Sequence, residues 1–308
     1  MEFITIIILS LVPALIYAII IFSVVPHNAI TPKIGLHYLC GGALSVVLLL
    51  SFFGIAPFWG GISQSVFVPR LKPLEFLHFK NFIEIAFIEE LSKFLVFLII
   101  EKRRRKKGKL NDHPLATMFY VGMVSLGFAI VENVHYGLSV VDPTTTIMWR
   151  SITAVIGHIV FGLFMGYWIV IGRIGGRVKN RSLLDIMVLN KENVRRDIFS
   201  FIGVFVAIVL HGVYDLHIDM NGHKGLTTLY MLLIFSLVGI FWCFINVNNL
   251  HIKKLNIEKK WQKKEQLRLY LKKGQKRNLL QKRTPRQKRN LLQKRKLLQK
   301  RNPRQKRS

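Results

Sequence analysis

The chain has 308 residues, of which 51% are hydrophobic, and it carries 45 Lys and Arg against 16 Asp and Glu, a formal net charge of +29. Mean hydropathy is nevertheless positive at +0.34, so charge and hydrophobicity lie in different segments. Residues 249–308 hold 24 of the basic and 2 of the acidic residues. The two cysteines, Cys40 and Cys243, lie in apolar runs and form no disulfide framework, which excludes a secreted disulfide scaffold. A multi-pass membrane protein with a basic tail remains.

Seven windows of mostly apolar residues follow one another along residues 1–248. A bilayer core about 30 Å thick needs about 20 such residues per helix. The sequence therefore predicts an all-α polytopic bundle of about seven transmembrane helices. The first window has Glu2 where a signal peptide would be basic, and we expect it to be retained as a span. The windows are 3–25, 34–57, 82–100, 115–138, 151–174, 198–217 and 226–248.

The distribution of Lys and Arg between the windows predicts the orientation, because cytoplasmic loops retain basic residues. With the N-terminus outside, 39 basic residues fall on the inner side, including the Lys102–Lys109 cluster and the loop from Arg173 to Arg196. Five fall on the outer side, among them Arg150, and Lys93 lies within a span. We therefore expect the N-terminus outside and the C-terminus in the cytoplasm.

The C-terminal segment divides into two parts. Residues 249–274 are basic and juxtamembrane, and could form an interfacial helix with Trp261 and Tyr270. Residues 275–308 repeat a six-residue unit beginning Gln-Lys-Arg, a period that fits no helical stripe. This pattern predicts a disordered low-complexity tail held to anionic lipids by its charge. We expect no specific nucleic-acid binding, because no recognisable nucleic-acid module accompanies the charge.

Several ionisable residues lie inside the predicted spans, where each costs a few kcal/mol and so marks a candidate functional site. At 1.5 Å per residue, Glu89, Glu132, His158 and His211 all lie about 9 to 11 Å below the outer boundary of their spans. Carboxylates and imidazoles thus share one layer. These residues are Glu89, Glu90 and Lys93 in the third span, Glu132 in the fourth, His158 in the fifth, and His211 and Asp215 in the sixth.

Simpler explanations exist for part of this set. Lys93 follows Glu89 by four residues and Glu90 by three, so an ordinary buried ion pair would account for one glutamate but not for both. Asp215 follows His211 by four residues and would orient its ring, a contact that catalytic and metal-bound histidines also make.

Carboxylates and histidines at one depth suit hydrolysis by an activated water. A buried Glu can accept the proton of water, His can hold that water, and Asn133 could donate to an oxyanion. Such a site needs no cofactor, but zinc stays open. The ligands of such an ion would come from Glu89, Glu90, His158 and His211.

Four sequence blocks resemble the motifs of the PrsW family of intramembrane proteases, which belongs with the CAAX prenyl endopeptidases and bacteriocin-processing membrane proteases. They are FIEELSKFLVF, GFAIVENVHYG, GHIVFGLFMGY and LHGVYDL, spread over about residues 80–216. The resemblance implies catalytic roles for Glu89, Glu90, His158 and His211, with Lys93, Glu132 and Asn133 in support. Asp215 stands where the family often has Asn.

The resemblance also implies an activity and a location. The family cleaves membrane-anchored proteins, for example an anti-sigma factor whose first-site cleavage starts a stress response. We therefore expect a multi-pass protein of the bacterial cell membrane whose partners are a membrane-anchored substrate and the lipid bilayer. A layer about 10 Å below the outer face would reach a bond near the extracytoplasmic end of a substrate helix.

Three alternatives remain beside this hypothesis. An ion- or proton-coupled carrier would use the same buried charges, but it predicts an internal repeat that the sequence does not show. A non-catalytic scaffold on the same fold is disfavoured by the intact glutamates and histidines. Prenyl-protein processing would need a site nearer the cytoplasm.

Overall fold

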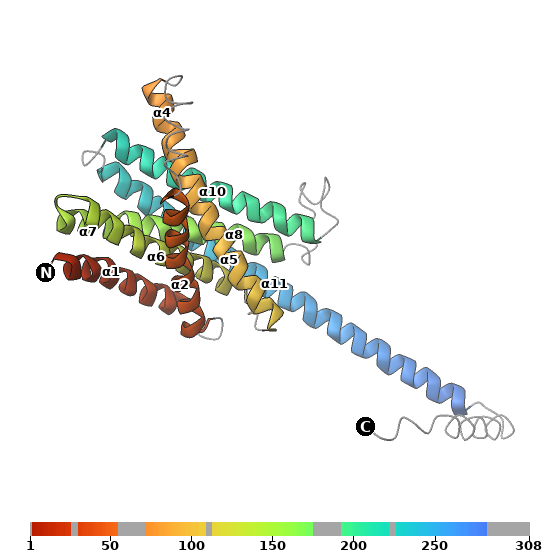
Figure 1. Ribbon diagram of the computed structural model, residues 1–308. Helices are drawn as coiled ribbons and strands as arrows, with labels where there is room; N and C mark the ends of the chain where they lie inside the picture. Colours follow the sequence, from red (N-terminus) through yellow and green to blue (C-terminus); the bar gives the residue numbers. More distant parts are fainter. Residues whose placement is uncertain are drawn as a thin grey trace. The chain divides into compact units, whose positions relative to one another are not determined.

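In the computed structural model, the residues described are 2–25, 30–54, 72–108, 113–174, 192–221 and 226–281, and all regular structure among them is helical. This confirms the predicted all-α class (Figure 1). The helices are α1 (Glu2–Val24), α2 (Pro32–Gly54), α4 (Pro73–Phe79), η3 (Lys80–Phe87), α5 (Ile88–Lys106), α6 (Pro114–Ser139), α7 (Pro143–Ile152), α8 (Ala154–Ile174), α10 (Glu192–Asn221) and α11 (Leu226–Gln281).

Five stretches of the described chain are long and apolar enough to cross a membrane, judged by length and composition. They correspond to the first and the last four predicted windows and show a multi-pass membrane protein. The second and third windows are helical as α2 and as η3 with α5, and α5 carries Glu89, Glu90 and Lys93 within its apolar stretch. The count of seven spans and their orientation stay predictions. The five stretches are Phe3–Ser23, Pro114–Ser139, Pro143–Ile174, Val194–Asn221 and Leu232–Gly274.

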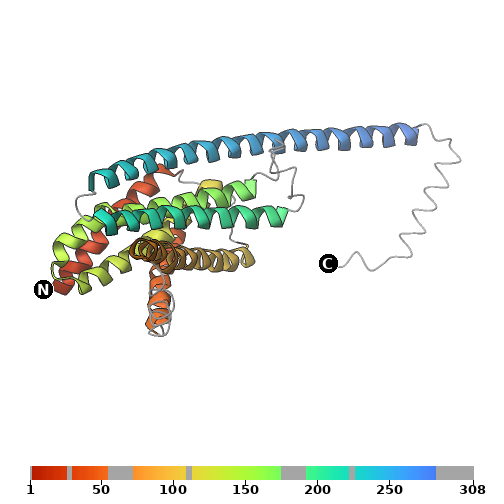
Figure 2. The same cartoon turned by 90° about the horizontal axis from the view of Figure 1, so that it is seen from above.

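The chain divides into two compact units, Met1–Lys253 and Lys254–Ser308. In the first unit, α8 packs against α6 and against α10, while α1 and α2 pack on α6 (Figure 2). The centre of this unit is filled by large side chains that are almost fully buried, such as Met118, Leu126, Met165 and Ile169. Helices α6 and α8 therefore form the rigid frame on which the polar residues of the spans are held.

Glycine lets α2 and α6 cross with their backbones in contact. A Cβ atom at Gly42 would overlap the carbonyl of Val124, and one at Gly127 would overlap the carbonyl of Leu39. Small residues at such crossings allow the close packing that drives helix association in membranes.

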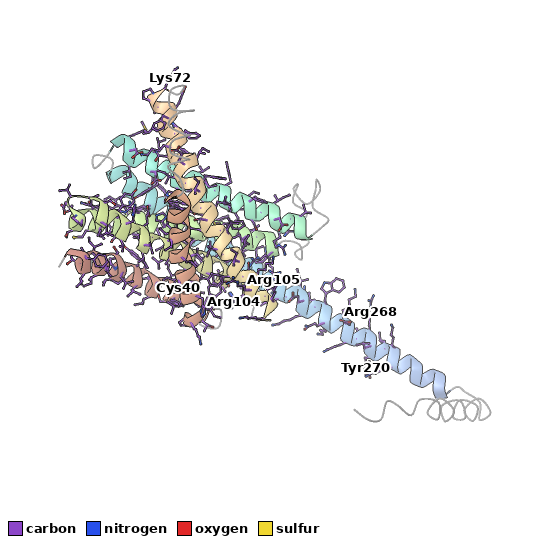
Figure 3. All side chains as sticks on the ribbon, in the orientation of Figure 1. Cys40, Lys72, Arg104, Arg105, Arg268 and Tyr270 are labelled. Atoms are coloured by element: carbon purple, nitrogen blue, oxygen red, sulfur yellow. The ribbon has the colours of Figure 1, made fainter. Side chains whose placement is uncertain are left out.

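Helices α4, η3 and α5 follow one another as a continuous rod that crosses the other helices of the first unit (Figure 1). Lys72 lies at one end of this rod, and Arg104 and Arg105 lie at the other (Figure 3). Its middle part, η3, is π-helical and ends two residues before Glu89. Wide π-helical turns change the angular register of the residues that follow and are frequent at functional sites.

The predicted fifth span begins earlier than the sequence analysis placed it. Asp142 caps α7 by accepting a hydrogen bond from the Thr145 backbone nitrogen at 3.2 Å, and Pro143 occupies the first turn. A single residue, Thr153, separates α7 from α8. The chain therefore enters this segment at residue 143, and Arg150 belongs to a helix, where the sequence analysis had placed it in an outer loop.

Helix α11 continues to Gln281, so the first residues of the six-residue repeat are helical where the sequence analysis expected disorder. Lys, Arg, Leu and Gln are good helix formers, and the first proline of the repeat is Pro285. Trp261 and Tyr270 are largely exposed on this helix, and an interfacial role for residues 249–274 stays a prediction. The rest of the tail, residues 282–308, and the basic loop residues 175–191 lie outside the described residues.

Candidate active site

All eight site residues predicted from the sequence belong to one connected polar cluster inside the first unit. Four helices supply them, and the structure brings them into contact, whereas their depth in a membrane stays a prediction. The rings of His158 and His211 lie 5.0 Å apart, centre to centre, at an angle of 89°. The contributions are Glu89, Glu90 and Lys93 from α5, Glu132 and Asn133 from α6, His158 from α8, and His211 and Asp215 from α10.

Lys93 lies at the centre of the cluster and is 1% exposed. Its ammonium group donates to Glu90 Oε1 at 2.7 Å and lies 3.5 Å from Glu89 Oε2. It also lies 3.0 Å from His158 Nδ1 and 4.0 Å from the centre of the Phe128 ring. A buried charge is tolerated when it is paired and hydrogen-bonded. Lys93 is therefore more than the partner of one glutamate, because it joins Glu89 and Glu90 to His158 of α8.

The contacts of His158 determine its tautomer. Its Nδ1 atom faces the Lys93 ammonium, which can only donate, so Nδ1 is the accepting nitrogen. The proton of the neutral ring is then on Nε2, which donates to Glu132 Oε2 at 2.7 Å. His158 is 2% exposed, and this chain of hydrogen bonds holds its ring in one orientation.

His211 is held by carboxylates at both ring nitrogens. Nδ1 lies 2.9 Å from Glu90 Oε1, and Nε2 lies 3.2 Å from Asp215 Oδ2 and 3.9 Å from Glu89 Oε2. Both ring nitrogens can donate to carboxylates only when the imidazole carries a proton on each of them. Binding of a metal through one nitrogen would release the proton on that nitrogen. Asp215, one helical turn after His211, thus orients the ring as expected.

Arg150 is a further member of the cluster, one that the spacing of charges in the sequence did not predict. One Nη atom lies 2.9 Å from Glu132 Oε1, Nε donates to Asn133 Oδ1 at 2.9 Å, and the guanidinium lies 3.7 Å from the centre of the Tyr136 ring. The Asp-Pro pair at residues 142–143 is a helix-start signal, and it could have placed Arg150 on a helix.

Asn133 does not lie where it could donate a hydrogen bond to an oxyanion, the role that the sequence analysis expected for it. Its oxygen is bound by Arg150, and its Nδ2 atom is buried with no hydrogen-bond partner within the described part of the chain. Asn133 is not among the described residues that line the cavity next to the cluster. In this arrangement it holds Arg150, and Arg150 is the group that faces the cavity.

A cavity of about 580 Å³ connects the cluster to the ends of several helices. Glu132, His158, His211 and Asp215 line its inner part. Its wall also includes Lys80, Asp142 and Asp219, which belong to the start of η3, the cap of α7 and the last turn of α10. Polar side chains therefore line the cavity from the two histidines to one end of the helices. A path by which water reaches the histidines would need such a lining.

Three of the residues have the arrangement that a metal ion needs. Glu89, His158 and His211 each offer a ligand atom, and these atoms lie within 4.8 Å of one another. Glu89 Oε2 is buried and has no hydrogen-bond partner among the described residues. One carboxylate and two imidazoles are a common zinc ligand set. The residue types fit such an ion, which would replace one contact of His158, either with Lys93 or with Glu132. Glu90 is not part of this three-residue group.

Comparison with known proteins gives one consistent result. The chain is 30% identical over 167 residues to the protein named Protease PrsW of Shouchella clausii, which covers 53% of this chain and 65% of the relative. It is 26% identical over 183 residues to Protease PrsW of Clostridioides difficile, covering 58% and 63%. The matched segments thus span less than two thirds of these relatives, and no solved structure matches the chain.

The family comparison covers more of the chain. The model described as PrsW family intramembrane metalloprotease matches residues 34–241, a range that holds every residue of the cluster and both cavity-lining histidines. Because this match spans most of the chain and agrees with the motifs and the buried cluster, the chain belongs to the PrsW family of intramembrane metalloproteases.

Proposed function

We propose that the protein is an intramembrane endopeptidase that hydrolyses a peptide bond near the extracytoplasmic end of a membrane-anchored protein. The observation that carries this proposal is the buried Glu89, His158 and His211 cluster next to a polar cavity that continues to the helix ends. A membrane-anchored anti-sigma factor is the substrate class we propose from the family resemblance.

The position of the cluster along the helices supports the site of cleavage. Glu132 lies seven residues before the end of α6 at Ser139, which is about 10 Å at 1.5 Å per residue. The same end of the helices carries the polar residues at the far part of the cavity. With the N-terminus outside, as the basic residues predict, this end faces the extracytoplasmic side, so water and the substrate bond meet there.

We assign different roles to the two glutamates from their environments. Glu90 is fully buried, and its Oε1 atom contacts both Lys93 and His211. The Glu89 side chain is 13% exposed and makes only the longer, 3.5 Å contact with Lys93. The Oε2 atom of each glutamate has no hydrogen-bond partner among the described residues, so the difference lies in exposure and in the contacts of Glu90 Oε1. Glu89 is therefore the residue that accepts the proton of the attacking water, and Glu90 is the residue that holds the cluster together.

The proton and bond changes follow from this assignment. Water adds through its oxygen to the carbonyl carbon of the substrate, and its proton goes to Glu89. Glu89 then gives that proton to the peptide nitrogen as the carbon–nitrogen bond breaks. Arg150 lines the cavity beside Glu132 and is the cation placed to stabilise the oxyanion.

Glu89, His158 and His211 would hold a divalent ion such as zinc. When bound, zinc supplies a Lewis acid and a water that ionises near neutral pH.

Cleavage is tested by co-expressing the protein with a panel of single-span membrane proteins that carry tags at both ends. The wild type should shorten at least one of them, and His158→Gln should not. His78→Gln is the matched control, because His78 is exposed on α4 and lies outside the cluster. Equal shortening by the wild type and by His158→Gln would contradict the proposal.

Metal binding is tested separately by elemental analysis of the purified full chain. Zinc should be retained in equimolar amount by the wild type and by His78→Gln, and should be lost in His211→Gln. A chelator should also lower the unfolding temperature of the wild type. Equal zinc in the wild type and in His211→Gln would overturn the assignment of the ligands.

A further inference from the structure

A second cavity, of about 470 Å³, lies between α5, α8 and α10 at the other end of these helices from the active-site cavity. Its lining includes Lys102 and Arg105 near the end of α5, Arg173 at the end of α8, and Arg196 near the start of α10. Figure 3 shows Arg105 at the end of the rod opposite to Lys72. Lys102 is thirteen residues beyond Glu89 on α5, about 20 Å along the helix.

The charges around this cavity are not balanced internally. Arg173 donates to Glu101 and, at 3.0 Å, to Thr117, and Glu101 lies 4.0 Å from Arg105. The carboxylate of Glu101 is thus shared by two arginines. Lys102 forms no ion pair with any residue that the structure describes, and Arg173 Nε is buried without a hydrogen-bond acceptor among those residues.

The second carboxylate at this cavity changes the balance little. Asp197 pairs with its neighbour Arg196 at 3.3 Å, and its side chain is 59% exposed. Exposed ion pairs of this kind contribute little. Among the described residues, the cavity is therefore lined by four cations and two carboxylates, and the Asp197 carboxylate is largely in solvent. The net charge of this lining is positive and some of its N–H donors have no acceptor in the described part of the chain, so the cavity favours the binding of an anion.

The wall of the cavity changes from basic to apolar along each helix. On α5, Leu98 precedes Lys102 by one turn, and on α10, Phe201 follows Arg196 by five residues. In both helices the apolar side chain is about 6 to 8 Å nearer the middle of the span than the cation. Leu98 and Phe201 are 37% and 67% exposed. Charged groups at one height and exposed apolar groups just inside them match the boundary between headgroups and acyl chains.

We propose that this cavity binds the phosphate group of an anionic phospholipid, with an acyl chain lying on Leu98 and Phe201. Arginine forks and a lysine are the side chains that bind phosphate oxygens most effectively. The expected orientation places the cavity at the cytoplasmic leaflet, where anionic lipids and basic pockets between spans meet. This inference does not depend on the proteolytic activity.

The bound lipid would also connect the helices of the active site. The helices that line the cavity, α5, α8 and α10, carry Glu89, His158 and His211. A ligand that binds their ends in the folded state raises the stability of that state. Anionic lipid should therefore raise the unfolding temperature of the full chain as well as bind to it.

Lipid binding is measured by native mass spectrometry on the full chain in a nonionic detergent, with added dioleoyl phosphatidylglycerol, dioleoyl phosphatidylcholine or glycerol 3-phosphate. The test variant is Lys102→Gln with Arg105→Gln. The matched control is Lys106→Gln with Arg103→Gln, which removes the same two residue types from the same helix end at exposed positions outside the cavity. Unfolding temperatures without lipid show whether both variants fold.

We expect the wild type and the control variant to retain one phosphatidylglycerol, and the test variant to bind it at least tenfold more weakly. Phosphatidylcholine should bind more weakly to all three proteins. Equal losses in both variants, or none in the test variant, would overturn the site, because the binding would then follow the overall charge of +29. Equally tight, cavity-dependent binding of glycerol 3-phosphate would support a phosphate site but assign it to a soluble ligand.

Discussion

Replacing Glu89 and Glu90 of α5 one at a time by glutamine should separate catalysis from folding. Glu90 is fully buried and forms a 2.7 Å ion pair with Lys93, which is itself 1% exposed. Removing one partner of a buried ion pair leaves the other charge uncompensated and costs about 3 to 5 kcal/mol. For a domain of this size each kcal/mol lowers the unfolding temperature by roughly 2 to 4 °C, so Glu90→Gln should lower it by roughly 10 °C.

Glu89→Gln should reduce the cleavage rate strongly and the stability only slightly. Glu89 lies 3.5 Å from Lys93, which keeps its closer partner Glu90 in this variant, and the loss of stability should be about 1 kcal/mol or less. Loss of the group that accepts the proton of water should instead reduce the cleavage rate by about 10² to 10⁴.

The two variants are compared by thermal unfolding of the detergent-purified proteins and by the cleavage rate at a temperature where both are folded. Glu84→Gln is the control, because Glu84 lies on η3 outside the cluster. The assignment fails if Glu90→Gln is as stable as the wild type, or if Glu89→Gln keeps its activity while Glu90→Gln, still folded, loses all of it.

Three further predictions concern other parts of the structure. Arg150→Lys should keep the charge but lose the bidentate contacts to Glu132 and Asn133. At a temperature where the variant is folded, it should lower the cleavage rate by about tenfold or more, and an unchanged rate would refute the role of Arg150. Gly127→Ala should destabilise the protein by about 1 to 3 kcal/mol in denaturant unfolding, because the new Cβ atom overlaps the Leu39 carbonyl on α2, whereas Gly274→Ala, in open space, should not. The Thr145 hydroxyl and backbone N–H hold the pKa of the Asp142 carboxyl below its usual range, so the stability that the wild type gains over Asp142→Asn should be complete above about pH 4 and should disappear as the pH falls through the lowered pKa; a difference that grows on acidification would contradict this.

The meeting of these residues in one cluster could be predicted because it depends on two simple quantities. Helices of fixed rise that cross the same bilayer place residues of similar distance from the span ends at similar depth. Charged groups are rare in spans and therefore stand out in the sequence. The contacts of Glu89, Glu90, His158 and His211 agree with this prediction, even though α10 begins six residues before the predicted sixth window.

The network within that cluster could not be predicted from spacing alone. Arg150 lies one residue before the predicted fifth window, in the segment expected to be an outer loop, and hydropathy could not show that α7 turns it toward Glu132. Arg150 also donates a hydrogen bond to the side-chain oxygen of Asn133, so Asn133 holds Arg150 and is not among the described residues that line the cavity. The π-helical turn before Glu89 also leaves no signal in hydropathy. Depth can be read from one helix, whereas contacts depend on how several helices are rotated against one another.

The most direct test of the central claim maps new protein N-termini in membranes that contain the wild type or Glu89→Gln at equal levels, by mass spectrometry of terminal peptides. The proposed activity predicts termini that are present with the wild type and absent with Glu89→Gln, and that lie near the extracytoplasmic ends of membrane-spanning segments. Identical termini in the two membranes, or cleavage confined to the cytoplasmic ends, would contradict it.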